Sequence, residues 1–211
     1  MATRTQLKPR KMPTQARSKA TVEAVLGAAA HVFERHGYAA ATTDRIAERA
    51  GVSVGSLYQY FPNTDAILVT LAERHIDAGF ALVGELLAGV MIEMPALETL
   101  LRRFVVAMIA LHEHEPELHR VLFEEAPLPS SVRRRLQRRE NDFAAEVCEL
   151  LRAHPAARIV DPNVTAYVLV HCVDALVHDF ILHPPKNIDA ESLTHEMVCM
   201  LVRHLSAGEG G

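Results

Sequence analysis

Apolar residues recur along the chain at the spacing of an amphipathic helix. One set follows an i, i+3, i+4, i+7, i+11 pattern that places its members on one face: Val22, Val25, Leu26, Ala29 and Phe33. The pattern predicts a first helix over about residues 18–36, ended by Gly37. No stretch of the sequence shows the period-two alternation between turn residues that is typical of a strand. The sequence therefore predicts an all-α protein.

Two shorter helices are expected directly after the first. Thr42 or Thr43 can cap a helix that ends at Ala50, because a threonine side chain accepts a hydrogen bond from the first helical turn. After a glycine-containing turn, Ser53 can cap another helix that ends at about Tyr60. The spacing thus predicts three helices within a module of residues 17–64.

The later helices are longer. They are expected over about residues 64–91, 95–114, 116–125, 127–153, 162–183 and 189–206, which gives about nine helices in all. We expect three parts in the chain: an arm of residues 1–16, the short-helix module of residues 17–64 and a helical body of residues 65–211.

Charge is distributed unevenly over a chain of 211 residues whose formal net charge is −4. Residues 1–65 hold nine Lys and Arg against five Asp and Glu, whereas residues 66–211 have a net charge of −8. The first twenty residues carry only basic charges: Arg4, Lys8, Arg10, Lys11, Arg17 and Lys19. Prolines make residues 1–16 a poor helix, so a flexible basic arm is expected. A basic front indicates a polyanionic partner.

The number of cysteines and the length of the apolar runs indicate the redox state of the thiols and the location of the protein. Cys148, Cys172 and Cys199 are odd in number and far apart, which argues against a disulfide framework or a zinc ribbon. No run of consecutive apolar residues approaches the roughly 18 of a membrane span, and no signal peptide is recognisable. We therefore expect a cytoplasmic protein with no membrane partner.

The segment from Thr43 to Ser53 follows the pattern of a helix-turn-helix motif. Ile46, Ala47 and Leu57 are expected to face inward. The outward set is small, hydroxylated or amide-bearing: Ser53, Val54, Ser56, Tyr58, Gln59 and Tyr60. Hydroxyl groups bind phosphate oxygens, and a glutamine offers both a donor and an acceptor to a base edge. Double-stranded DNA is the partner that this surface indicates.

Residues 16–68 closely resemble the DNA-binding domain of TetR-family transcriptional regulators. The resemblance lies in several motifs: Phe33-Glu34-Arg35-His36-Gly37-Tyr38, Thr42-Thr43, Ile46-Ala47, Ala50-Gly51-Val52-Ser53, Gly55-Ser56-Leu57-Tyr58 and Tyr60-Phe61-Pro62-Asn63. It implies a homodimeric, non-enzymatic repressor whose C-terminal helices form a pocket for a small-molecule effector and the dimer contact. It implies no cofactor.

The resemblance also implies roles for individual residues. Thr42, Thr43, Tyr58 and Tyr60 correspond to phosphate contacts. The full expected DNA-binding set is Thr42, Thr43, Arg45, Ser53, Val54, Gly55, Ser56, Tyr58, Gln59, Tyr60 and Thr64. Thr64 departs from the family pattern, because many relatives have a lysine at this position. A threonine brings no charge there, so a weaker salt dependence is expected, which the basic arm can offset.

Two sequence patterns suggest other chemistry. Residues 51–55 fit G-x-S-x-G, the nucleophile elbow of serine hydrolases, but that motif needs a strand before its serine, and a helix is expected here. Residues 112–119 are rich in His and Glu but do not form H-E-x-x-H. We interpret them as a solvated helix end, and no metal site is expected.

The helix expected over residues 162–183 has no face typical of open solvent. Leu169, Val173, Leu176 and Phe180 share one face, and the opposite one is semi-polar: Tyr167, His171, Asp174 and His178. A dimer contact is the first interpretation, over Tyr167, Asp174, His178, Leu193, Met197, Met200 and Leu201. The alternative is a metal- or pH-responsive regulator that uses the His/Asp face.

The effector pocket is expected among apolar residues of the body. Its candidate residues are Phe104, Met108, Leu111, Phe123, Phe143, Val147 and His171. Core packing is the alternative for all of them. A run of arginines over residues 133–139 is interpreted as a solvated helix start that pairs with Glu124, Glu125 and Glu140. The sequence thus predicts a sequence-specific regulator, most simply a repressor released from a palindromic operator by an effector.

Overall fold

The computed structural model describes residues 7–10, 15–113 and 116–206, and within these ranges the regular secondary structure is helical throughout. The chain divides into two compact units. The first unit comprises residues 1–76 and 117–133, and the second comprises residues 77–116 and 134–211. The all-α prediction is confirmed for the described residues.

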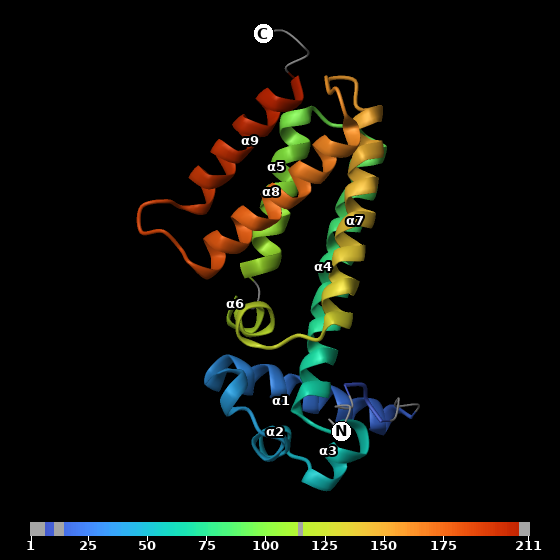
Figure 1. Cartoon of the computed structure of the whole chain (residues 1–211), viewed down its shortest axis with the longest axis vertical. Coiled ribbons are helices and arrows are strands. Elements are labelled where there is room, and N and C mark those ends of the chain that lie inside the picture. The colour runs from blue at the N-terminus through green and yellow to red at the C-terminus, as the bar shows by residue number, and fades with distance from the viewer. Residues whose placement is uncertain (1–6, 11–14, 114–115, 207–211) are drawn as a thin grey trace. The chain divides into compact units, whose positions relative to one another are not determined.

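The first unit contains three helices of the N-terminal segment (Figure 1): α1 (Ala16–Ala40), α2 (Thr43–Ala50) and α3 (Val54–Tyr60). Gly37 interrupts α1 with a φ of 71°, a left-handed conformation that costs glycine little, so the predicted helix end at this position is confirmed. The core of the unit contains Phe33, Leu57 and Phe61, each fully buried. These large side chains fix the angle at which the short helices cross.

Helix α4 (Thr64–Glu93) begins in the first unit and continues into the second. The first unit is completed by most of α6 (Pro116–Arg120) and by a π-helical turn, η1 (Val121–Glu125). The turn η1 packs on α1, where Oε2 of Glu125 accepts a 3.4 Å hydrogen bond from the backbone N–H of Tyr38. The same carboxylate forms an ion pair with Arg120.

The second unit is built from longer helices: α5 (Leu97–Glu113), α7 (Ser130–Ala153), α8 (Pro162–Leu182) and α9 (Ala190–Ser206), together with the later part of α4. Helix α5 packs against both α8 and α9 (Figure 1). Asp161 caps α8 by accepting hydrogen bonds from the N–H groups of Asn163 and Val164. The predicted helix positions agree with these bounds to within a few residues.

Two helices, α4 and α8, are long and apolar enough to cross a membrane by length and composition. Neither helix consists of the roughly 18 consecutive apolar residues considered in the sequence analysis. Such helices also occur in the cores of soluble proteins, and α8 buries Leu169, Val173 and Val177 in the core of the second unit.

Candidate DNA-binding surface and effector cavity

The turn between α2 and α3 is held by local hydrogen bonds. Gly51 adopts a left-handed conformation (φ 66°), and its N–H donates to the carbonyl oxygens of Ala47 and Glu48 at the end of α2. Oγ of Ser53 accepts a 3.1 Å hydrogen bond from the N–H of Ser56 and so caps α3. Thr42 caps α2 in the same way, with a 3.3 Å bond from the N–H of Arg45. The sequence signals for both caps are confirmed.

The outer face of α3 presents side chains that are open to solvent. Val54 and Tyr58 are 37% and 38% exposed, respectively, and Gln59 is also exposed. The hydroxyl groups of Thr43 and Tyr58 share a 3.1 Å hydrogen bond, which places two of the expected phosphate contacts at one point between α2 and α3. The structure therefore brings together the start of α2 and the face of α3, as the helix-turn-helix interpretation requires.

The other expected DNA-binding residues surround this face. Ser53 and Gly55 are exposed, whereas Ser56, Tyr60 and Thr64 are half-buried. Arg45 is exposed, and its Nη1 donates a 2.8 Å hydrogen bond to the carbonyl oxygen of Ala40. This bond holds the guanidinium against the end of α1, so only its remaining N–H groups are available to a phosphate.

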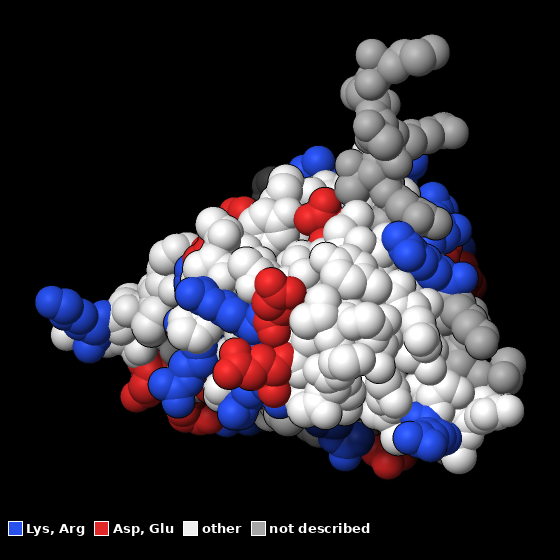
Figure 2. All heavy atoms as spheres, turned by 90° about the horizontal axis from the view of Figure 1, so that it is seen from below, with Lys and Arg blue, Asp and Glu red and all other residues white. Residues whose placement is uncertain are grey.

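Basic residues lie at the border of the surface. The space-filling view from below shows an uncharged area with Lys and Arg side chains at its border and Asp and Glu side chains interspersed among them (Figure 2). Part of the predicted basic arm is described: the backbone N–H of Arg10 donates a 2.7 Å hydrogen bond to the carbonyl oxygen of Tyr60. Residues 1–6 and 11–14 of the arm lie outside the described residues.

A surface groove between α1 and α2 was not foreseen from the sequence. It has a volume of about 410 Å³ and is lined by His31, Val32, His36, Arg45, Glu48 and Arg49. The lining of the groove comes from two helices, with His31, Val32 and His36 on α1 and Arg45, Glu48 and Arg49 on α2, and the spacing within a single helix does not show that the two sets meet. The groove places Arg49 beside Arg45, which belongs to the expected DNA-binding set.

The first unit also fixes the start of α4, which carries Thr64. The hydroxyl of Tyr38 donates a 2.7 Å hydrogen bond to Oδ1 of Asp65. Burial and then the neighbouring Asp65 carboxylate raise the pKa of Tyr38 to about 12. The bond ties the end of α1 to the first turn of α4.

A cavity in the second unit is lined by apolar side chains alone. Its volume is about 30 Å³, and it lies among α4, α5, α7 and α8. The lining consists of Val83, Leu86, Leu87, Val90, Leu100, Leu101, Phe104, Phe143, Val147, Leu150, Leu151 and Leu169. Of the expected pocket residues, Phe104, Phe143 and Val147 line this cavity.

The remaining expected pocket residues lie elsewhere. Met108 is buried in the core without lining the cavity, and Leu111 lies against Gly79. Phe123 belongs to the first unit, where its ring stacks at 4.6 Å from that of His119. Its assignment to the pocket was wrong, because residues 121–125 form the π-helical turn of the first unit instead of continuing into the body.

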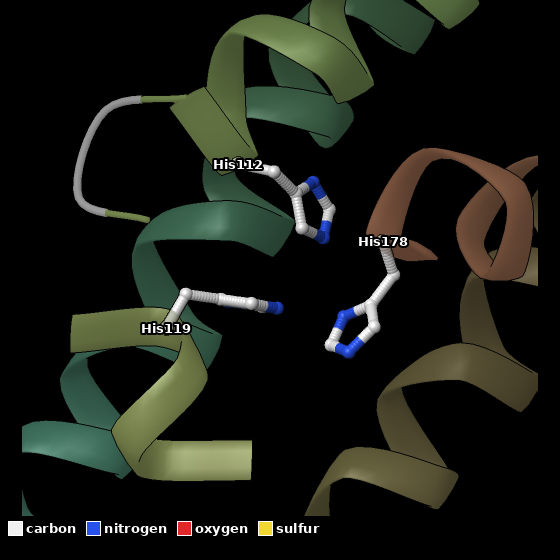
Figure 3. Close-up of side chains that lie close together, drawn as sticks. All are labelled: His112, His119 and His178. Carbon is white, nitrogen blue, oxygen red and sulfur yellow. The ribbon is translucent and has the colours of Figure 1, made fainter. Parts of the chain in front are cut away.

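The histidines predicted to be solvated are buried. His112 and His119 are each 5% exposed, which corrects the interpretation of residues 112–119 as a solvated helix end. Nδ1 of His112 donates a 2.8 Å hydrogen bond to the carbonyl oxygen of Met108. Within the second unit, the rings of His112 on α5 and His178 on α8 point toward one another with centroids 6.1 Å apart (Figure 3).

Two of the arginines near the start of α7 have partners on α4. Arg135 forms a 2.7 Å ion pair with Asp77, and the guanidinium of Arg139 lies 5.1 Å from the ring centroid of Phe80. Glu125 pairs instead with Arg120. Both α7 arginines thus contact α4 within the second unit.

The expected dimer residues divide into two groups. Met197 and Leu201 are only 3% and 5% exposed, so their side chains belong to the core of the second unit and correct the expected assignment to an interface. Tyr167 and Met200 are exposed, whereas Asp174, His178 and Leu193 are half-buried. An exposed apolar stripe on α8 was missed: Val164, Val168, Cys172 and Leu176.

Taken together, the capped helix-turn-helix and the helical body define a DNA-binding regulator with a separate cavity-bearing unit. Residues 25–71 match the family model of bacterial regulatory proteins of the tetR family, and residues 96–205 match the model named Tetracyclin repressor-like, C-terminal domain. The chain belongs to the TetR family of transcriptional regulators.

Similar proteins include both regulators and a nucleoid factor. The HTH-type transcriptional activator FasR of Mycolicibacterium smegmatis is 37% identical over 106 residues, which cover 47% of this chain and 44% of FasR. This chain therefore matches less than half of the length of FasR. The nucleoid occlusion factor SlmA of Aliivibrio fischeri is 27% identical over 177 residues, which cover 78% of this chain and 88% of SlmA.

Solved structures share the fold. The fatty acid degradation regulator FadR from Bacillus halodurans aligns with a TM-score of 0.66 and 18% identity, over 90% of this chain and 97% of FadR. AibR, solved in complex with isovaleryl coenzyme A and operator DNA, aligns with a TM-score of 0.61 and 21% identity, over 86% of this chain and 98% of AibR.

Proposed function

We propose that this TetR-family regulator binds a pseudo-palindromic operator as a homodimer, with α3 of each protomer in a major groove. The observation that carries the proposal is the outer face of α3, which is free of charged residues, has Val54 as its one aliphatic side chain and lies between helix ends capped by Thr42 and Ser53. A helix of this shape fits a groove about 12 Å wide, and a capped turn fixes its orientation.

Each polar group on this surface has a proposed role. Gln59, Val54, Gly55 and Ser56 face base edges, where the Gln59 amide supplies a donor and an acceptor. The hydroxyl-bearing set contacts phosphates: Thr42, Thr43, Ser53, Tyr58, Tyr60 and Thr64. The hydrogen bond between Thr43 and Tyr58 supports this division, because it orients both hydroxyls before DNA arrives.

We propose that the basic arm and the groove arginines, Arg45 and Arg49, add contacts to the flanking backbone. They compensate for the missing charge at Thr64. Phosphate contacts made by charged side chains release counterions, so they set the salt dependence of binding.

The dimer is proposed to form through α8 and the exposed part of α9. The α8 stripe of Val164, Val168, Cys172 and Leu176 is apolar and exposed in one protomer, as is Met200 on α9. A contiguous exposed apolar face of this kind marks an interaction surface in a soluble protein. A second copy of the chain covers it with the same residues, as two-fold symmetry demands.

The effector is proposed to enter the apolar cavity of the second unit and to release the operator, so that the protein acts as a cytoplasmic repressor. AibR, which shares the fold, was solved in complex with isovaleryl coenzyme A and operator DNA, which supports control by a ligand. FasR is named an activator, so activation is the alternative to repression that experiment must test. A ligand shifts the equilibrium only if it binds the DNA-free conformation more tightly than the DNA-bound one. Deletion of the gene is expected to raise transcription from the operator.

A gel-shift titration with DNA from upstream of the protein's own gene tests the DNA-binding proposal. Gln59→Ala and Tyr58→Phe are expected to weaken binding by about threefold to thirtyfold each, because each removes one hydrogen-bonding group. Gln137→Ala, an exposed glutamine on α7 of the second unit, is the matched control. Equal affinities for Gln59→Ala and Gln137→Ala would contradict the proposed role of α3.

A further inference from the structure

Two histidines face one another inside the second unit, and we call them the α5–α8 histidine pair: His112 and His178. His112 lies near the end of α5 and His178 near the end of α8, and these two helices pack against each other. The two rings point toward one another, with centroids 6.1 Å apart and planes at 84° (Figure 3). The fold therefore brings together two imidazoles from distant parts of the sequence.

A backbone hydrogen bond fixes the ring of His112. Its Nδ1 donates to the carbonyl oxygen of Met108, which is 2.8 Å away. In a neutral imidazole the other nitrogen then carries the lone pair, so Nε2 is the atom of His112 that can bind a metal ion. Histidines that bind metals usually donate the other ring N–H to a carbonyl oxygen or a carboxylate in this way. His112 is therefore held in the tautomer of a metal ligand.

The separation within the α5–α8 histidine pair suits one shared ion. A ring nitrogen of His112 and a ring nitrogen of His178 lie within 4.8 Å of each other. Two nitrogens that bind one zinc ion at tetrahedral angles are about 3.3 Å apart, because each Zn–N bond is about 2.0–2.1 Å long. The difference is at most about 1.5 Å, and a rotation of the half-buried His178 side chain can cover it.

Apolar core residues flank both histidines. Ile109 on α5 and Val177 on α8 are buried and belong to the hydrophobic core of the second unit. His112 is only 5% exposed, whereas His178 is half-buried. An apolar shell around a metal site limits the access of solvent to the ion. The partial exposure of His178 gives an ion a path to the pair.

We propose that the α5–α8 histidine pair binds one divalent transition-metal ion, Zn²⁺. Imidazole nitrogens are favoured ligands of zinc, copper and nickel, whereas Mg²⁺ and Ca²⁺ take oxygen ligands. Two imidazoles leave further coordination positions of the ion to other ligands. The ion joins α5 to α8 and so stabilises the folded second unit. The inference is independent of the proposed operator and effector, because it concerns only how this unit binds an ion.

An edge-to-face contact between two rings is stable without an ion, so the experiment must separate ring packing from metal binding. The full-length chain is prepared without a histidine tag and freed of metal with EDTA. After the EDTA is removed, the chain is titrated with ZnCl₂ in a calorimeter, and MgCl₂ serves as the matched salt. We expect one Zn²⁺ to bind per chain and no measurable binding of Mg²⁺.

Histidine variants locate the site. His112→Gln and His178→Gln are each expected to weaken Zn²⁺ binding about a hundredfold or more, because each removes a ligand. His204→Gln, an exposed histidine on α9 of the same unit, is the matched control and is expected to bind Zn²⁺ as the wild type does. Circular dichroism in EDTA shows whether each variant is folded. Because His178 is half-buried, His178→Gln keeps the test decisive if the buried His112→Gln does not fold.

Two further measurements report on the bound ion. Zn²⁺ is expected to raise the melting temperature of the wild type and of His204→Gln but not that of His178→Gln, because a ligand that binds only the folded state stabilises it. X-ray absorption at the zinc edge is expected to show at least two imidazoles on the ion.

Three results would overturn the inference. They are the absence of Zn²⁺ binding by the wild type, equal Zn²⁺ affinities of His178→Gln and His204→Gln, and an X-ray absorption spectrum with fewer than two imidazoles. All three concern the ion alone, so a failure of the gel-shift test of α3 leaves the metal site unaffected.

Discussion

The two units differ in how they present their candidate binding residues. In the first unit, the candidate DNA-binding residues are exposed or half-buried at the surface, and Thr42 and Ser53 cap the two helices that carry most of them. In the second unit, the candidate effector residues are buried, and the cavity among them is small. DNA presents a groove of nearly constant shape, so a rigid surface suits it. An effector that switches a protein needs a site whose packing can change.

The largest expected effect is a loss of stability in the first unit. Leu57 is fully buried between α3 and the rest of the first unit, so Leu57→Ala is expected to lower the free energy of unfolding by about 2–5 kcal/mol. Val54→Ala, on the exposed face of the same helix, is expected to change stability by less than about 0.5 kcal/mol while altering operator affinity. Thermal denaturation and gel shift measure the two effects.

The inverse result would remove the distinction between core and DNA-facing positions of α3. In that inverse result, Leu57→Ala is as stable as the wild type, whereas Val54→Ala unfolds at a markedly lower temperature.

A cavity-filling substitution tests the packing of the second unit. Val147→Phe adds a ring to the apolar cavity, and overpacking is expected to cost about 1–3 kcal/mol. Operator affinity measured by gel shift should remain close to that of the wild type, because the first unit is untouched. An unchanged melting temperature would show that the cavity accepts the added ring without strain and would contradict this expectation.

The bond between Tyr38 and Asp65 offers a smaller effect with a pH signature. Tyr38→Phe is expected to reduce stability by about 1 kcal/mol at pH 7. The folded pKa of Tyr38 is about 12 against an ordinary value of 10.0, so the phenol's contribution is complete below pH 10 and is lost as pH rises through 12. Denaturant titrations should therefore show wild-type stability falling more steeply than that of the variant above pH 10. Parallel curves would contradict this assignment.

The smallest expected effect concerns Glu140. Its pKa is raised from the ordinary 4.5, so ionisation is less favourable in the folded state, and stability declines as pH rises through the folded pKa. Glu140→Gln should therefore stabilise the protein at pH 7, by less than about 1 kcal/mol because the side chain is partly solvated, and not below pH 4.5. A stability gain that is the same at pH 4 and pH 7 would exclude this cause.

Local signals explain why the helix-turn-helix could be predicted so closely. Gly51, Ser53 and Thr42 determine the turn and both caps through hydrogen bonds to residues within four positions. Periodicity likewise predicted the burial of Ile46, Ala47 and Leu57. These features depend on neighbours in sequence, which a sequence displays directly.

The body was less predictable because its features depend on contacts between distant segments. Met197 and Leu201 have the periodicity of any apolar stripe, and only the position of α5 makes them core residues. His112 and His119 resemble solvated residues until packing buries them. The groove at Arg45 and Arg49 similarly arises from how helices meet.

The central claim is that two copies of α3 read a two-fold symmetric DNA site. Selection of bound duplexes from a random-sequence pool, followed by sequencing, tests it most directly. The account predicts enrichment of one pseudo-palindrome whose half-site centres lie about 34–36 Å or a multiple apart, with enrichment lost in Gln59→Ala and retained in Gln137→Ala. No enrichment, or an enriched sequence without two-fold symmetry, would contradict it.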